Sequence, residues 1–327
     1  MPAIEKKRLH HADYKIGWAC ILEVEFIAAV SMLDQEHERL SSHPNDPIVY
    51  SVGRIGSHNV VIAYPLHAGV SPAQTLVENM RTSFPCVQFA LLVGIGGGVP
   101  RSTGAGAIRL GDVVVGKSND SSSAVVHYDR STGSSATFVP PPSLELLKAA
   151  EDASKRARQY NTITANCGRI NTSLPRMKCF KFPGAGADTL YQSDHIHAQP
   201  KIPCERSGCD SRRLVQRPSD ARRRDDCPII HWGKVASGDQ VMKDALLRDQ
   251  LAHQHGIICF EMEAAGVMTR LPCLVVRGIS DYCDSHKNDD WQAYAAAVAG
   301  GFAREVCLSY QTRRCHEDSV CLFGSQS

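Results

Sequence analysis

Short, nearly continuous apolar runs alternate along the chain with segments whose apolar residues recur at helical spacing. Runs of the first kind predict strands buried on both faces, at 14–22, 87–94, 108–116, 124–128, 229–239 and 273–279. Helical spacing predicts helices over 23–33, 72–80, 144–158, 243–253 and 291–310, and a short helix that opens at Glu261. Two further strands, 48–52 and 59–64, flank turn residues and predict a hairpin. The alternation indicates a three-layer α/β/α sandwich around a central mixed sheet.

Composition narrows the possible partners. The chain has 327 residues, a net charge of +2 and a pI of about 8.0, which gives no polyelectrolyte signal and argues against nucleic acid as a partner. The N-terminus lacks an apolar signal region and no run of eighteen apolar residues occurs, so we expect neither secretion nor a membrane span. The 13 cysteines are scattered, which suits a reducing compartment. We therefore expect a soluble cytoplasmic protein.

One domain, residues 14–312, is expected between a flexible N-terminus (1–13) and a flexible C-terminal tail (313–327). Within it, residues 167–227 form a variable insertion that mixes cysteines, histidines and a basic cluster at 222–224. Zinc is one interpretation of this composition. However, the insertion has no Cys-x-x-Cys pair, and His195 and His197 do not have the spacing of a zinc finger. We therefore expect no metal, no cofactor and a solvated basic surface.

Two carboxylate-bearing strings, 260–266 and 274–281, stand inside otherwise apolar segments about twenty residues apart. An unpaired charge there costs several kcal/mol. Either acid alone would more often be a structural partner. As a pair at the C-terminal edge of a sheet, where α/β proteins place ligands, they predict a small-molecule site.

The glycine run 94–98, followed by Pro100, would let a ligand approach the backbone. It lacks the third small residue of a dinucleotide fingerprint, and proline stands where a phosphate-binding helix should begin. A tight turn without a ligand is the alternative interpretation.

Several strings together resemble the purine/uridine phosphorylase superfamily, and more closely its nucleoside phosphorylase-like domains of fungal type. They are 15–18 with Glu25, 94–98, 110–115, 237–239, 241–244, 260–264 and 277–288, and the resemblance covers about residues 14 to 310. It implies a nucleoside phosphorylase-like fold, a homo-oligomer, and a small-molecule nucleoside or nucleotide as the substrate. Similar domains also occur as N-terminal modules of large receptor-like fungal proteins, and we expect this chain to be a free-standing copy.

The resemblance also implies roles for individual residues. Asp281 matches the acid that protonates the departing base. The matching substrate-binding positions are Glu263 and Met262 at the ribose, Gly96 and Gly97 at the border of the base, Val241 and Met242 as the base-facing wall, and Ser280. The aromatic residue that stacks on the base in bacterial nucleosidases is missing at Val241.

Glu25 decides between two reactions. Phosphorylases hold phosphate with two arginines and a serine, and this chain has Glu25, Leu92 and Ile95 at those places. A glutamate at the position of Glu25 activates water in the methylthioadenosine/S-adenosylhomocysteine nucleosidases. Hydrolysis by Glu25 and Asp281 is therefore favoured, as in inverting glycosidases. A solvated carboxylate at the start of a helix is the alternative interpretation of Glu25. A phosphate-dependent phosphorylase and a nucleotide-sensing or effector module remain the alternative functions.

Overall fold

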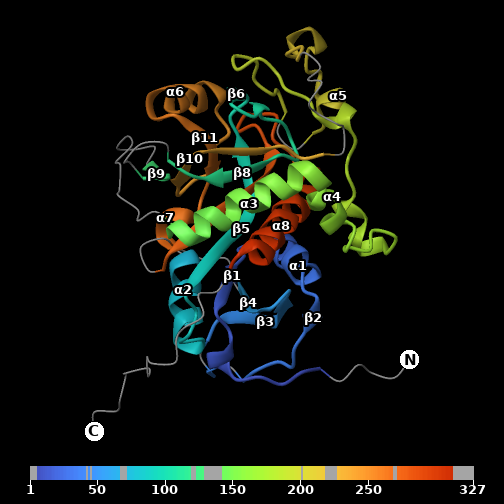
Figure 1. Ribbon diagram of the computed structural model, residues 1–327. Helices are drawn as coiled ribbons and strands as arrows, with labels where there is room; N and C mark the ends of the chain where they lie inside the picture. The colour runs from blue at the N-terminus through green and yellow to red at the C-terminus, as the bar shows by residue number, and fades with distance from the viewer. Residues whose placement is uncertain are drawn as a thin grey trace.

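The computed structural model describes residues 6–41, 43–44, 46–66, 72–118, 123–128, 142–199, 202–217, 227–267 and 271–311. A twisted sheet runs through the middle of the molecule, and helices cover both of its faces (Figure 1). This arrangement confirms the predicted α/β/α sandwich with a mixed sheet. The predicted C-terminal tail (313–327), the first five residues and the basic cluster at 222–224 lie outside the described residues.

The sheet of the described chain has ten strands, in the order β11-β10-β8-β12-β5-β1-β4-β3-β2 with β9 beside β10. Its central strands are β1 (Ile16–Ala19), β5 (Phe89–Gly98), β8 (Val113–Gly116), β10 (Ile230–Gly238), β11 (Ile257–Glu261) and β12 (Cys273–Asp281). The predicted hairpin is β3 (Ile48–Ile55) and β4 (His58–Pro65). The remaining strands are β2 (Gln35–Glu36), β9 (Val125–Tyr128) and the small pair β6 (Ser102–Thr103) and β7 (Gly106–Ala107).

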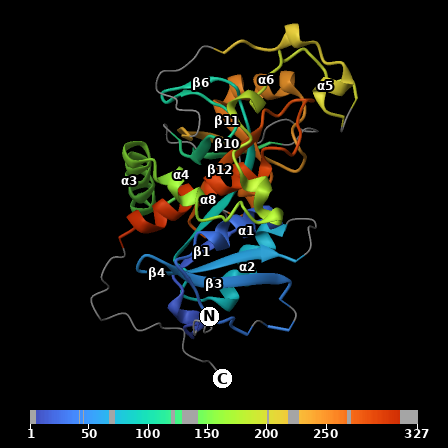
Figure 2. The same cartoon turned by 90° about the vertical axis from the view of Figure 1, so that its right-hand side faces the viewer.

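Two apolar cores lie on the two faces of the sheet. On one face pack α1 (Glu23–Ser31), α3 (Leu144–Tyr160), α4 (Thr162–Cys167) and α8 (Gln292–Ser309). The other face is covered by α2 (Pro72–Ser83) and α7 (Ala264–Val267), while α6 (Ala245–His255) packs on β11 (Figure 2). Every residue of α8 from Ala293 to Cys307 is buried, because its alanines and glycines let the sheet and the neighbouring helices approach closely. No helix in the described ranges is long and apolar enough to cross a membrane.

Three local predictions were wrong. The strand predicted over 87–94 continues to Gly98, so the glycine run is its end and the alternative of a tight turn is wrong. Glu261 is the last residue of strand β11, and the short helix α7 begins three residues later. The strand predicted over 108–116 begins only at Val113, because Gly111 takes a φ of +81° and turns the chain.

Candidate active site

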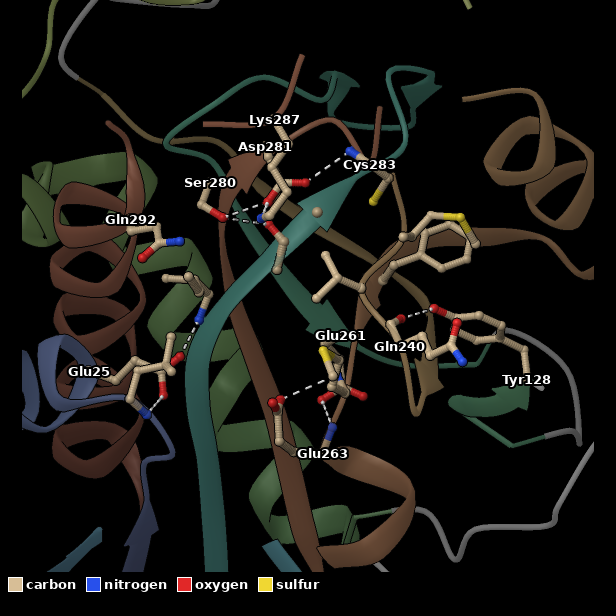
Figure 3. Close-up of a pocket in the computed structure, with 18 residues that line it drawn as sticks. Glu25, Tyr128, Gln240, Glu261, Glu263, Ser280, Asp281, Cys283, Lys287 and Gln292 are labelled. Carbon is tan, nitrogen blue, oxygen red and sulfur yellow. Dashed lines mark hydrogen bonds and ion pairs between the residues drawn. The ribbon is translucent and has the colours of Figure 1, made fainter. Parts of the chain in front are cut away.

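All nine predicted site residues line one cavity, whose empty volume is about 740 Å³ with its open mouth included. They are Glu25, Gly96, Gly97, Val241, Met242, Met262, Glu263, Ser280 and Asp281. The cavity lies where β5, β10, β11 and β12 reach their C-terminal ends and where α1 begins. This edge of the sheet is where open α/β proteins bind their ligands. Figure 3 shows Asp281 and Glu263 on opposite sides of it, with Glu25 along a third side.

The glycines at the end of β5 allow the strand ends to close around the cavity. β5 pairs with β12 along most of its length, and at Gly97 and Gly98 it also pairs with β11 in antiparallel register. A Cβ at Gly97 would lie 2.1 Å from Cys283 Sγ and 2.7 Å from Asp281 Oδ1, and one at Gly96 would lie 2.8 Å from Cys259 Sγ. Side chains at these two positions would push the acid-bearing strand away. The glycines therefore serve packing as well as ligand access.

Glu25 is buried, with 5% of its surface exposed, and is not the solvated helix-start carboxylate of the alternative interpretation. Its Oε2 accepts hydrogen bonds from the backbone N–H groups of Ile21 (2.9 Å) and Leu22 (3.0 Å) at the start of α1. Its Oε1 accepts one from Ile95 N (2.9 Å) in the glycine run. Because a carboxylate offers about four acceptor positions, one remains for a water molecule in the cavity.

A buried arginine joins the acids beneath the cavity. Arg277, on β12, donates from Nη2 to Glu261 Oε2, lies 3.0 Å from Glu263 Oε2 and donates from Nη1 to Ile95 O (3.3 Å). Glu261 also accepts hydrogen bonds from Glu263 N (3.1 Å) and Ala264 N (3.0 Å) and so caps the start of α7. Of the two acids in this string, Glu261 is therefore a structural partner.

Glu263 also lines the cavity, with 19% of its side chain exposed against 0% for Glu261. Its carboxylate has one backbone donor, Met262 N at 3.3 Å. Desolvation, followed by the nearby Glu261 and Glu25, raises its pKa to about 8 against the opposing effect of Arg277. Glu263 is thus the acid in this group that keeps a proton near neutral pH.

Asp281, the last residue of β12, is held by three donors. Its Oδ1 accepts from Cys283 N (2.9 Å), and its Oδ2 accepts from Ser280 Oγ (3.0 Å) and from Lys287 Nζ. Lys287 lines the cavity as well, and Figure 3 shows it next to the carboxylate. The ion pair fixes the orientation of the Asp281 carboxylate.

The wall opposite Glu25 is apolar and partly aromatic. Met242 is buried, whereas Val241 and Met262 expose 43% and 42% of their surfaces beside the cavity. Phe260 and Tyr128 meet edge to face, with ring centroids 5.5 Å apart, and both line the cavity. They supply the aromatic surface that the sequence lacks at Val241.

The positions that would bind phosphate in a phosphorylase are apolar or already engaged. Leu92 is buried in the core on the α2 side, and the backbone N–H of Ile95 is bonded to Glu25. Among the described residues that line the cavity, Lys287 is the one cation, and it is paired with Asp281. Arg277 lies beneath the cavity and is held by the acids.

Several side chains at the cavity were not predicted as site residues from the sequence: Tyr128, Gln240, Phe260, Cys283, Lys287 and Gln292. Lys287 stands in the string 281–288 that carried the resemblance, so its position was a usable signal. Tyr128 lies at the end of β9 and Gln292 at the start of α8, and nothing in their local sequence connects them with the site.

No family model matches the chain. It is 34% identical over 312 residues to a nucleotide-binding leucine-rich repeat (NLR)-like protein of Hyaloscypha variabilis, a match that covers 92% of this chain and 30% of that protein. It is also 36% identical over 77 residues to the ATP nucleosidase Cap17 of Escherichia coli, which covers 22% of this chain and 15% of the relative. The chain thus spans less than a third of the length of either relative.

Among solved structures, the chain is similar to the 5'-methylthioadenosine/S-adenosylhomocysteine nucleosidase of Neisseria meningitidis in complex with methylthio-immucillin-A. The TM-score is 0.58 at 15% sequence identity, and the match covers 90% of this chain and 99% of the other. This likeness shows a shared fold.

Proposed function

We propose that this chain, which has the nucleoside phosphorylase-like fold of the purine/uridine phosphorylase superfamily, hydrolyses the N-glycosidic bond of a purine nucleoside or nucleotide. The observation that carries the proposal is the set of three carboxyl side chains, Glu25, Glu263 and Asp281, which face one cavity from three sides (Figure 3). The similarity to an ATP nucleosidase and to a methylthioadenosine nucleosidase supports the same reaction class.

In the proposed reaction, the bond between the ribose C1' and the base nitrogen breaks, and its electron pair leaves with the base. Asp281 passes a proton from the Lys287 ammonium to a ring nitrogen, so that the nucleobase departs neutral. Lys287 Nζ, which already donates to this carboxylate, is the nearest group that can supply that proton. The apolar wall of Phe260, Met242 and Val241 holds the flat base against Asp281.

A water molecule held by Glu25 attacks C1' and gives its proton to that carboxylate. Three backbone N–H groups fix the Glu25 side chain, so this proton acceptor is oriented before the substrate binds. Glu263, on the opposite side from Asp281, accepts or donates hydrogen bonds at the ribose hydroxyls.

Hydrolysis is favoured over phosphorolysis because the cavity offers a phosphate dianion no free cation among its described lining residues. Phosphate beside Glu25 would place like charges together in a partly dry site, which is costly at short range.

The test is product analysis with the purified chain. Adenosine, methylthioadenosine and ATP are incubated with and without phosphate or arsenate, and the base and sugar products are separated. We expect free base and free ribose or its 5'-derivative, at a rate indifferent to phosphate. Glu25→Gln should abolish base release, whereas Glu23→Gln, an exposed acid in the first turn of the same helix, should not. Ribose-1-phosphate as the main product would overturn the hydrolytic mechanism.

A second candidate, an effector module within a larger receptor-like protein, is favoured by the match to one third of an NLR-like protein. In that case nucleotide binding is the main role and turnover is slight. Equilibrium binding of ATP in the absence of base release would support this second role over the first.

A further inference from the structure

Four potential metal ligands from distant parts of the chain meet outside the active-site cavity. They are His197, Cys204 and Cys209 from the insertion and His286 from the loop after β12, and their ligand atoms all lie within 4.8 Å of one another. His286 is 82 positions from Cys204 and 77 from Cys209. The spacing of ligands within the insertion could not reveal this group.

Three of the ligand separations match a tetrahedral zinc site, and all four ligand atoms lie within 4.8 Å of one another. Zn–S bonds of about 2.3 Å and Zn–N bonds of about 2.0–2.1 Å, at tetrahedral angles, put neighbouring ligand atoms roughly 3.3–3.8 Å apart. His286 Nδ1 lies 3.5 Å from Cys204 Sγ and 3.7 Å from Cys209 Sγ, and His197 Nδ1 lies 3.8 Å from Cys204 Sγ. The contact from His197 Nδ1 to Cys209 Sγ, at 3.0 Å, is somewhat shorter.

Both histidines turn the same ring nitrogen toward the group. His197 Nε2 lies 2.9 Å from Ile202 O, and His286 Nε2 lies 3.0 Å from His195 O. A carbonyl oxygen can only accept, so each Nε2 carries the hydrogen and each Nδ1 presents a lone pair to the centre. Metal-bound histidines are commonly fixed in this way, by a carbonyl on the second nitrogen.

The surroundings hold the group in place. The ring of Tyr191 stacks on His286 with centroids 4.0 Å apart and an interplanar angle of 16°, and His197 is buried. The backbone N–H of His197 also donates to Ser285 Oγ (2.9 Å), next to His286. The insertion is thus docked on the 281–288 loop at the position of the four ligands.

We propose that His197, Cys204, Cys209 and His286 bind a zinc ion in a closed, structural Cys2His2 site. Two thiolates and two imidazoles suit zinc among the common divalent ions. Four protein ligands leave no position open for substrate, so the ion takes no part in bond breaking. Its effect is to attach the insertion to the loop that carries Lys287, the partner of Asp281.

The first measurement is the metal content of the chain purified without chelator. We expect one zinc ion per chain, and close to none in Cys204→Ser, Cys209→Ser and His286→Ala. Cys179→Ser, which removes an exposed cysteine of the same insertion, is the matched control and should keep the ion. His286→Cys should restore binding, because it supplies a different but suitable ligand.

Cobalt provides a test that does not depend on variants that fail to fold. The apoprotein, prepared with a chelator and reductant, should bind Co²⁺ with the intense visible bands of tetrahedral coordination and the charge-transfer band of thiolate ligands. Removal of one ligand should weaken Co²⁺ binding by at least the roughly 100-fold that loss of a supporting partner can cause. Metal should also protect two thiols from alkylation.

Three results would overturn the proposal: no zinc and no tetrahedral cobalt spectrum in the unaltered chain, equal metal content in the Cys204 and Cys179 variants, or a disulfide between Cys204 and Cys209 that persists when the protein is purified with reductant and without chelator. None of these measurements requires turnover, so the zinc proposal can fail or hold independently of the proposed hydrolysis. If both proposals hold, removal of the ion should lower kcat through the Lys287 loop and leave Glu25-dependent water activation in place.

Discussion

Replacement of Asp281 by asparagine tests the proposed acid directly. The amide oxygen can still accept from Cys283 N, but the amide nitrogen faces two donors, Ser280 Oγ and the Lys287 ammonium. The variant loses both the acidic proton and the ion pair. Asp281→Asn should therefore remove most base release while the strand on which the residue lies keeps its place in the sheet.

The size of the effect follows from the role. General acid catalysis contributes about 10²- to 10⁴-fold in rate. At 1.36 kcal/mol per factor of ten, this is roughly 3–5 kcal/mol of transition-state stabilisation. The unpaired buried donors cost an additional ~1–3 kcal/mol of folding stability. Asp281→Asn combined with Lys287→Met removes the uncompensated ammonium and should recover part of that stability without recovering the rate.

The assay compares two leaving groups. Adenine must be protonated as it departs, whereas the phenolate of a nitrophenyl riboside departs without a proton. The rate loss in Asp281→Asn should be large with the adenine nucleoside and small with the nitrophenyl riboside, when the single-turnover rate constant is measured for both. Equal losses with the two substrates would refute the acid role and leave Asp281 a binding or structural residue, as would near-normal adenine release.

Three further predictions concern neighbouring positions. Lys287→Met should lower kcat for adenine release about 10- to 100-fold and leave kcat for the nitrophenyl substrate unchanged, and Lys287→Arg should restore part of the lost rate. An equal loss of kcat with both substrates would mean that the lysine is purely structural. Gly97→Ala should destabilise the fold by about 1–3 kcal/mol in chemical denaturation, since its Cβ would meet Cys283 Sγ at 2.1 Å, whereas Gly104→Ala, with nothing within 4 Å, should be neutral. Glu263 keeps its proton to a pKa of about 8 in the folded chain and to 4.5 in the unfolded one, so its stabilising effect is complete below pH 4.5 and is lost as pH rises through 8. In the unaltered chain, the pH profile of kcat/KM should inflect near pH 8. Glu263→Gln, unlike Glu263→Ala, should keep kcat/KM below pH 8 and should lack this inflection. An inflection unchanged in Glu263→Gln would have to come from another titrating group.

Periodicity was enough to predict the architecture because the sheet is buried on both faces. The strands at the centre are continuous apolar runs, and α8 is a long helix of small residues, so both patterns are strong. The errors fall where backbone geometry is set by tertiary contacts. The run 94–98 has the composition of a turn, yet pairing with β12 and β11 holds it extended.

The candidate site was predictable as far as the resemblance reached and no further. All nine inferred residues line the cavity: eight lie at or just after the C-terminal ends of strands, and Glu25 lies in the first turn of α1. The meeting of His286 with Cys204 and Cys209 was not predictable, because it depends on how the insertion folds back onto the 281–288 loop. Ligand spacing is informative when all ligands lie in one segment, and here one of four lies elsewhere.

The charges beneath the cavity give a physical reason for a preference for hydrolysis. Three acids, Glu25, Glu261 and Glu263, act on the one guanidinium of Arg277, so carboxyl groups outnumber the buried cation. A negative charge below the sugar stabilises a ribosyl group that becomes positive as the base leaves. The same charge repels a phosphate dianion but not a neutral water molecule. In the proposed mechanism, the arrangement that lowers the barrier to bond breaking therefore also favours water as the nucleophile.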